Sequence, residues 1–188
     1  MEGSLRMLGL DPDDFPTFDF EHVLEVDELT VIHNDRLGRE TVCSVRDVFR
    51  NPEAPAPHRR VYISRAEATY RRLVNEDEVW TLLQEAGFER VRMEDLTFDE
   101  QVALMHQTEV LMGVHGAGLS NMTFCNPSAH VVEIGVREYP SPDFYSTASS
   151  LGLDYSILFG EAVGEWVQRW PDIYLNPGKL TSLLARLD

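Results

Sequence analysis

Hydrophobic and polar positions along this chain follow the two periods that distinguish amphipathic helices from buried strands. From Asn75 to Gly87 the apolar residues recur three and four positions apart, which predicts a helix that Asn75 caps and Gly87 ends. From Val110 to Val114 every residue is apolar or glycine, a pattern typical of a strand buried on both faces. Patterns of these two kinds occupy most of the sequence after residue 60.

The order of these patterns indicates the fold class. Strands are predicted at 29–33, 61–63, 90–93, 110–114, 130–134 and 155–159. Helices are predicted at 41–50, 75–86, 119–125 and 144–151, with one that a Thr97–Glu100 capping box starts and a last one that Asn176-Pro177 starts. Because strands alternate with helices, we expect a Rossmann-like α/β fold, with a mostly parallel sheet covered by helices on both faces.

One proline-rich stretch divides the chain. Residues 51–58 (NPEAPAPH) hold three prolines within six positions, which excludes a helix and a central strand. Residues 1–19 are acidic, interrupted by proline and weakly periodic, so we expect them to be irregular. The sequence therefore predicts a lead-in at 1–58, with one short strand and one short helix, followed by a Rossmann-like domain at 59–188.

Composition narrows the possible partners. A chain of 188 residues, 43% of them hydrophobic, is long enough for one globular domain with its own core. Its 32 acidic residues outnumber 16 basic ones, of which only Lys179 is lysine, and the net charge is −16. This charge argues against nucleic acid and anionic lipid as partners, because both are bound by a surplus of positive charge. Such a composition is typical of a salt-adapted or GC-rich bacterial source.

The sequence contains no recognisable targeting segment. The N-terminal residues lack the pattern of a signal peptide, and no apolar run approaches the length of a membrane span. We therefore expect a bacterial cytoplasmic protein without a membrane span. The two cysteines, Cys43 and Cys125, lie far apart and predict neither a disulfide framework nor a metal site.

A glycine-rich turn follows the buried strand at 110–114. His115 lies between Gly113 and two further glycines, Gly116 and Gly118, and a short helix is predicted to follow. A strand that passes through a glycine turn into a helix is suited to phosphate, since small residues admit the ligand to the backbone N–H groups. The glycine order is GxxGxG and not the dinucleotide fingerprint GxGxxG. A tight strand–helix turn with a packed histidine is the alternative interpretation.

Arginines follow the first strand after the proline-rich stretch. Ligands of open α/β sheets lie at the carboxyl ends of strands, and Arg65 is placed directly after this one. A guanidinium pairs two phosphate oxygens at once, so Arg65 is a candidate for a diphosphate. Arg71 and Arg72 have an alternative, which is to form ion pairs with surface acids such as Glu67 or Glu76. For Arg71 we prefer that alternative.

His115 and Glu133 are the other candidates at strand ends. In the turn, His115 can donate a hydrogen bond to a phosphate or sugar oxygen, or act as a general base, and donation is the preferred interpretation. Glu133 lies inside the apolar run 131–134, where a carboxylate is costly unless it is paired. Two ribose hydroxyls or an internal arginine would satisfy it.

The sequence lacks the motifs of serine hydrolases, P-loop nucleotide-binding proteins and metal sites. The sequence after the turn has no GxSxG nucleophile elbow, and the one lysine follows no Walker A loop. The histidines lack the spacing of metal ligands, and no acidic pair at a strand end is suited to a divalent cation. We therefore predict no metal site and no cofactor.

Four linked motifs carry a resemblance to a known family. They are YISR at 62–65, RRLVNEDEV at 71–79, the EQV of the helix at 100–102, and HGAGLSN at 115–121. As a set, within residues 60–134, they resemble the catalytic core of glycosyltransferase family 61. That family includes bacterial capsular-polysaccharide enzymes, plant xylosyl- and arabinosyltransferases, and animal O-linked N-acetylglucosamine transferases.

The resemblance implies a fold, a reaction and a set of site residues. The fold is that of the C-terminal lobe of a GT-B glycosyltransferase, which makes 59–188 a nucleotide-sugar-binding domain, and the reaction is inverting and needs no metal. The residues implied for donor binding are Arg65 and Arg72 at the diphosphate, Gly116, Ala117 and Gly118 at the diphosphate and sugar, and Glu133 at the ribose. His115 is the catalytic candidate.

Two functions are consistent with these expectations. The first is an inverting, metal-independent glycosyltransferase, or its donor-binding lobe, that transfers a sugar from a nucleotide diphosphate sugar to a glycan hydroxyl in polysaccharide biosynthesis. The expected donor is a UDP-sugar. The second is a non-catalytic nucleotide-sugar-binding module that needs a partner chain. The chain has about the size of one lobe, which leaves three alternatives: a fragment, a naturally short member of the family, or half of a two-chain enzyme whose partner chain supplies the acceptor lobe.

Overall fold

One mixed sheet organises the part of the chain that the computed structural model describes, residues 2–15, 21, 25, 27–28, 38–138, 141–164 and 171–187. The strands are β1 (Arg59–Ile63), β2 (Phe88–Val91), β3 (Thr108–Val114), β4 (His130–Val136), β5 (Asp154–Val163) and β6 (Asp172–Tyr174). The α-helices are α1 (Glu2–Met7), α2 (Arg39–Val48), α3 (Glu76–Glu85), α4 (Phe98–His106), α5 (Asp143–Leu151) and α6 (Pro177–Leu184). The 3-10 helices are η1 (Pro12–Asp14), η2 (Met93–Asp95) and η3 (Ala117–Phe124).

The sheet has the order β2-β1-β3-β4-β5-β6, and the predicted parallel α/β architecture is confirmed. All neighbouring strands are parallel except β6, which is antiparallel to β5. The strand order reverses between β1 and β3, because the chain passes from β1 outward to β2 and then returns to the other side of β1. Ligands of doubly wound sheets bind at such a switch point, outside the carboxyl ends of the two strands.

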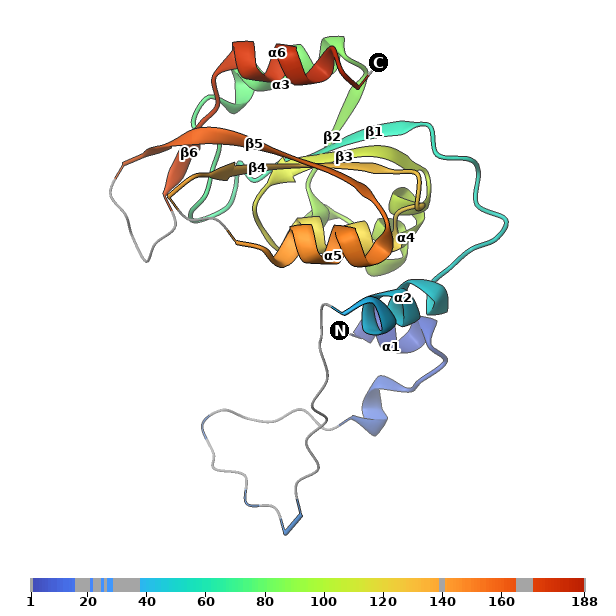
Figure 1. Ribbon diagram of the computed structural model, residues 1–188. Helices are drawn as coiled ribbons and strands as arrows, with labels where there is room; N and C mark the ends of the chain where they lie inside the picture. The colour runs from blue at the N-terminus through green and yellow to red at the C-terminus, as the bar shows by residue number, and fades with distance from the viewer. Residues whose placement is uncertain are drawn as a thin grey trace.

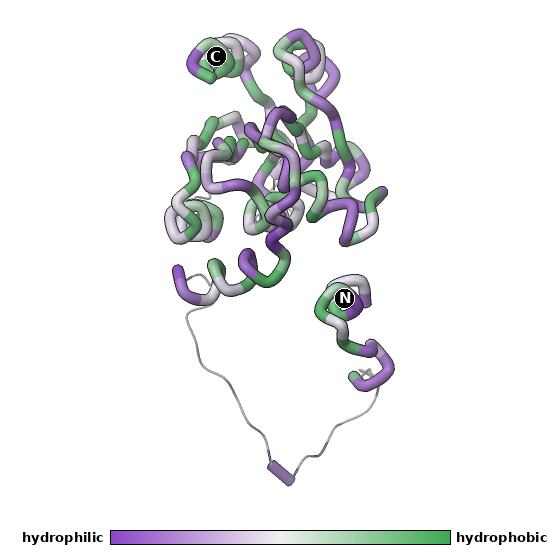
Figure 2. Tube along the Cα trace, turned by 90° about the vertical axis from the view of Figure 1, so that its right-hand side faces the viewer, coloured by the Kyte–Doolittle hydropathy of each residue, from purple (hydrophilic) through white to green (hydrophobic). Residues whose placement is uncertain are grey.

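Helices cover both faces of the sheet (Figure 1). On one face, α3 and α6 lie over a buried cluster that includes Leu83, Met112 and Leu180. On the other, α4, α5 and η3 lie over a cluster that includes Leu111 and Met122. The helix that leads to the C-terminus carries both hydrophobic and hydrophilic residues, and its buried residues are Leu180 and Leu184, as expected of a helix with one buried face (Figure 2).

The segment before the proline-rich stretch shares this core. Val42 of α2 is buried in the cluster of the second face. The rings of Phe49, Phe98 and Phe124 meet edge to face with centroids 5.4–5.6 Å apart, and they join the end of α2 to α4 and η3. α1 lies against α4, where Gly3 approaches Phe98.

Local departures from the predicted elements have local causes. Residues 2–7 are helical and not irregular, and Glu2 pairs with Arg6 across one turn at 3.2 Å. The helix predicted at 119–125 begins already at Ala117 and has 3-10 geometry. The strand predicted at 90–93 lies at 88–91, and the strand predicted at 29–33 falls outside the described residues. β6 was not predicted, because three residues are too few to show a period.

Some helix ends are capped by neighbouring residues, whereas the start of α3 is held by a residue far away in the sequence. The predicted capping box of Thr97 and Glu100 is confirmed, as is the stop at Gly152, which has φ 75°. Asn75 precedes α3, but its side chain makes no cap hydrogen bond. Instead its amide donates to the carbonyl of Leu175 at 2.9 Å and accepts from the N–H of Leu175 at 3.1 Å. Asn75 thereby ties the start of α3 to the residue after β6.

Candidate functional site

A crevice opens at the switch point, where β1 and β3 end. Its volume is about 340 Å³. The end of β1 contributes Ile63, Ser64 and Arg65, and η3 contributes Ala117 and Gly118. The structure thus brings the first arginine and the glycine turn together, as their positions at neighbouring strand ends predict.

Arg65 lies directly against the glycine turn. A Cβ atom at Gly116 would be 2.5 Å from Nη1 of Arg65, so only a residue without a side chain allows the guanidinium to lie there. Arg65 donates hydrogen bonds from Nη2 to the carbonyl of Tyr70 at 3.2 Å and from Nε to the carbonyl of Arg71 at 3.4 Å. Burial lowers the pKa of Arg65 from its usual value, because the cation loses part of its hydration.

The turn itself packs closely on β1. A Cβ atom at Gly118 would be 3.1 Å from Cγ2 of Ile63, which explains the second glycine of the turn. The N–H of His115 continues the strand ladder by donating to the carbonyl of Ile134 at 2.9 Å. Gly116 and Ala117 then lead into η3 at the mouth of the crevice.

Next to the turn, a buried carboxylate holds the histidine. Glu133 of β4 is 2% exposed, and its Oε1 lies 2.8 Å from Nδ1 of His115. Its Oε2 accepts a hydrogen bond from the hydroxyl of Tyr155, on β5. Burial and this hydrogen bond raise the pKa of Tyr155. Its hydroxyl therefore stays protonated at neutral pH and donates the hydrogen bond to Glu133.

These contacts select one tautomer of the histidine. A carboxylate accepts hydrogen bonds only, so Nδ1 of His115 carries the proton that points at Glu133, and in the neutral ring the lone pair lies on Nε2. The ring is fixed further by Phe144, whose centroid lies 4.9 Å away in an edge-to-face contact. This arrangement can accept a proton or a hydrogen bond from a group that approaches Nε2.

The partners of Glu133 differ from those that the sequence suggested. An internal arginine was one expected partner, and this expectation is wrong, because His115 and Tyr155 bind the two oxygens. Tyr155 was missed altogether. Its pairing follows from the register of β4 and β5, in which Tyr155 lies opposite Val131 and therefore on the same face of the sheet as Glu133.

The structure separates Arg72 from this crevice. Its guanidinium forms an ion pair with Asp172, with Nη2 and Oδ2 2.7 Å apart, and its side chain is 51% exposed. Its backbone N–H also donates to Asp172, at 2.8 Å. Arg72 therefore forms a surface ion pair, which was the alternative interpretation from the sequence. Its partner lies 100 residues away in the sequence.

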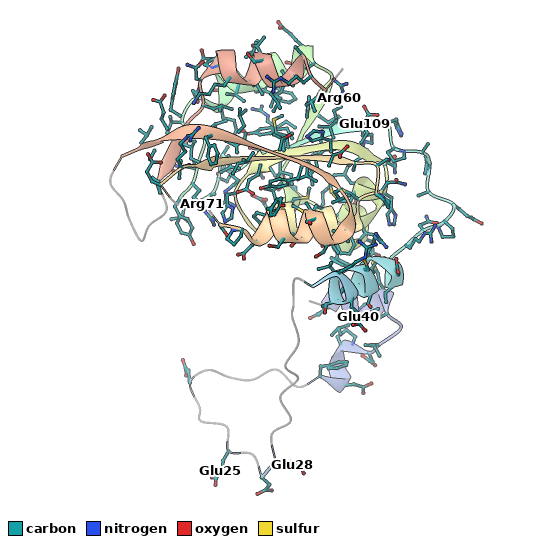
Figure 3. All side chains as sticks on the ribbon, in the orientation of Figure 1. Glu25, Glu28, Glu40, Arg60, Arg71 and Glu109 are labelled. Atoms are coloured by element: carbon teal, nitrogen blue, oxygen red, sulfur yellow. The ribbon has the colours of Figure 1, made fainter. Side chains whose placement is uncertain are left out.

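The two acids named as examples of surface partners for Arg71 make other contacts. Glu67 pairs with Arg92 at 3.7 Å, and Glu76 is buried and accepts a hydrogen bond from Ser64 at 2.5 Å. Glu76 is thus no surface acid, and it fixes the residue that precedes Arg65. Figure 3 shows Arg71 at the end of the sheet opposite to that of the ion pair between Arg60 and Glu109.

Neither a cluster of metal ligands nor a membrane-spanning helix is present among the described residues. They hold no group of three or more histidine, cysteine, aspartate or glutamate side chains arranged to bind a metal ion. Among them, no helix has the length and apolar character needed to cross a membrane.

The region that contains the crevice is similar to known proteins. The family model described as Glycosyltransferase 61 matches residues 8–132, which include Arg65 and the glycine turn. An alpha-1,3-arabinosyltransferase of Oryza sativa subsp. japonica is 31% identical over 153 residues, or 75% of this chain and 25% of the relative. An EGF domain-specific O-linked N-acetylglucosamine transferase of Drosophila melanogaster is 36% identical over 86 residues, or 44% of this chain and 16% of the relative.

A beta-1,2-xylosyltransferase of Arabidopsis thaliana is 30% identical over 100 residues, which is 46% of this chain and 19% of the relative. The chain therefore spans a quarter or less of the length of these three relatives. All three are named as glycosyltransferases, and they differ in the sugar that their names give.

Proposed function

Because the chain belongs to glycosyltransferase family 61, we propose that it is the donor-binding lobe of an inverting, metal-independent glycosyltransferase. Its donor is a nucleotide diphosphate sugar, with UDP as the nucleotide, and its acceptor is a glycan hydroxyl in polysaccharide synthesis. The observation that carries the proposal is the crevice at the switch point, where Arg65 lies against Gly116. A cation and a glycine turn at one strand end are what a diphosphate needs.

In this proposal, Arg65 and the turn bind the diphosphate. The guanidinium is half-buried, so its attraction to phosphate oxygens is screened less than that of an exposed arginine. Backbone N–H groups at Gly116 to Gly118 add neutral donors that do not need to be reoriented during the reaction. Both stabilise the charge that develops on the departing diphosphate.

His115 is the proposed general base. Nε2 takes the proton of the acceptor hydroxyl, the acceptor oxygen bonds to the anomeric carbon, and the bond from that carbon to the diphosphate oxygen breaks, which inverts the configuration. Glu133 stabilises the imidazolium that forms, through the hydrogen bond at Nδ1. The geometry thus favours the base over the donor role that the sequence led us to prefer.

Nucleotide-sugar binding is tested by thermal melts in EDTA with a panel of nucleotide sugars and with UDP. A ligand at about 100 times its dissociation constant adds about 2.7 kcal/mol to the free energy of unfolding, so the melting temperature rises measurably. EDTA removes divalent cations, and a shift that persists in EDTA is expected of metal-independent binding. If no nucleotide or nucleotide sugar shifts the melting temperature, the proposal is wrong.

Catalysis is tested separately from binding. The purified chain is incubated with a donor that stabilises it and with simple sugar acceptors, and release of the nucleoside diphosphate is measured. Product from the chain alone supports a complete active site. Binding without product supports the module that works only with a partner chain.

A further inference from the structure

The segment between β1 and α3 contains one unusual backbone position. Arg71 has φ 58°, and among the described residues it is the only one other than glycine with a positive φ. This left-handed conformation brings the side chain of an L-residue close to its own backbone, so glycine or asparagine normally occupies such a position. Strained residues of this kind cluster at ligand sites, where the surrounding structure fixes them.

The neighbours of Arg71 fix its backbone from two directions. On the crevice side, the Arg65 guanidinium donates to the carbonyls of Tyr70 and Arg71. On the other side, the carbonyl of Arg72 accepts from the N–H of Ile173 at 2.8 Å, and the side chain of Asp172 binds Arg72. The left-handed residue therefore connects the group that lies against Gly116 to the strand β6.

This turn separates the two adjacent arginines. The Arg72 guanidinium is taken up by Asp172 and is half-exposed. Nε of Arg71 is buried, and its guanidinium lies 5.6 Å from the ring centroid of Tyr70. Figure 3 shows Arg71 at the end of the sheet where β1 and β3 end. A turn that served only to reverse the chain would be less strained with glycine, so the side chain of Arg71 is the reason to look for a function.

We propose that Arg71, and not Arg72, is the second cation that binds the diphosphate of the donor. The inference rests on the proposed function and refines it. A diphosphate carries more than one negative charge, and the protein has a net charge of −16, so a single arginine has to overcome an unfavourable background. Arg71 is joined to Arg65 through its own carbonyl, which places the two residues at one end of the sheet. Arg72 then has an anchoring role at β6.

The test is titration calorimetry of UDP with the full chain, with Arg65→Ala and with four further variants. Arg71→Asn removes the cation and retains a residue that tolerates the left-handed backbone. Arg71→Gly removes both the cation and the strain. Arg72→Gln tests whether Arg72 is the second cation instead. Arg59→Gln is the matched control, because it breaks an ion pair with Glu89 at the opposite end of β1.

The expected result is a loss of at least about tenfold in UDP affinity for both Arg71 variants, as for the loss of one charged hydrogen bond. Melting temperatures of these variants equal or exceed that of the wild type, since the strain is reduced. Arg72→Gln and Arg59→Gln bind UDP within about twofold of the wild type. Unchanged affinity in the Arg71 variants, or a loss in Arg72→Gln alone, overturns the inference.

The control experiments separate this inference from the proposed function. If the wild type does not bind UDP or any other nucleoside diphosphate, the proposed function fails and this assignment fails with it. If the wild type binds and only Arg65→Ala loses affinity, the donor site stands and Arg71 is a structural turn residue. An Arg71→Asn variant that does not fold while Arg71→Gly folds and binds normally also assigns Arg71 to the turn.

Discussion

Two regions meet at the crevice, through Arg65 on one side and the glycine turn on the other, and they are held in place by different contacts. The turn wall comprises the turn at 115–118 with Glu133 and Tyr155 behind it, and its polar contacts converge on the buried carboxylate of Glu133. The arginine wall comprises residues 64–75, and several of its contacts are ion pairs and hydrogen bonds to β6 that remain partly exposed. Buried polar contacts are expensive to break, whereas exposed ion pairs contribute little.

This difference indicates separate tasks. The turn wall keeps the proposed base in one tautomer and has to be rigid. In the proposed function the arginine wall brings cations to the diphosphate, and its exposed contacts allow it to adjust at low cost. We therefore expect substitutions in the turn wall to change folding stability, and substitutions in the arginine wall to change ligand affinity.

The largest expected effect on stability is that of Glu133→Ala. It leaves the half-buried donors of His115 and Tyr155 without their acceptor and removes a buried side chain. The free energy of unfolding should fall by about 3 kcal/mol, as measured by urea denaturation. A loss below about 1 kcal/mol would show that water or rearranged side chains replace the carboxylate, and that the turn wall is softer than described.

High pH is expected to weaken the contacts of the turn wall. Burial raises the pKa of Tyr155 in the folded protein above that of the unfolded chain, so its contribution to stability is complete below about pH 10 and is lost as the pH rises above that value. Burial also raises the pKa of Cys125 to about 12 and raises the pKa of Tyr62. Ionisation of these two groups at high pH therefore also lowers the stability of the folded protein. The melting temperature should therefore fall from about pH 9 upward.

Tyr155→Phe isolates the contribution of the turn wall to that fall. The variant is less stable than the wild type at pH 8, because Glu133 loses a donor. It should lose less further stability between pH 9 and pH 11, since Cys125 and Tyr62 titrate equally in both proteins. Melting curves that decline in parallel would show that Tyr155 does not hold its proton as the contact with Glu133 requires.

The smallest expected effect is in the arginine wall. Asp172→Asn removes the charge that pairs with Arg72 and keeps an oxygen that can accept from its N–H. The melting temperature should fall by less than about 4 °C, and high salt should reduce the difference further. A larger drop, similar to that of Glu133→Ala, would remove the distinction between the two walls.

The same contrast explains what could be predicted from the sequence. The strand at 110–114, the turn at 115–118 and the capping box of Thr97 and Glu100 depend on residues a few positions apart, and these predictions are confirmed. The proximity of Arg65 to Gly116 followed from the rule that parallel strands end at one edge of the sheet. These features need no knowledge of distant contacts.

The features that were missed depend on distant pairings. Arg72 and Asn75 contact Asp172 and Leu175, each 100 residues away, through a strand too short to be recognised. The partner of Glu133 on β5 requires the register of two strands that are separated by a helix. The left-handed conformation of Arg71 has no signal in the sequence, because glycine and asparagine are the residues that mark such a position.

Arg65→Ala tests most directly whether a nucleoside diphosphate binds where Arg65 lies against the glycine turn. Titration calorimetry with UDP should give an affinity at least about tenfold below that of the wild type, because one charge-assisted hydrogen bond to phosphate is lost. The melting temperature without ligand should change little, since the hydrogen bonds of Arg65 go to carbonyls near the protein surface. Wild-type affinity in this variant would place the phosphates elsewhere and contradict the account.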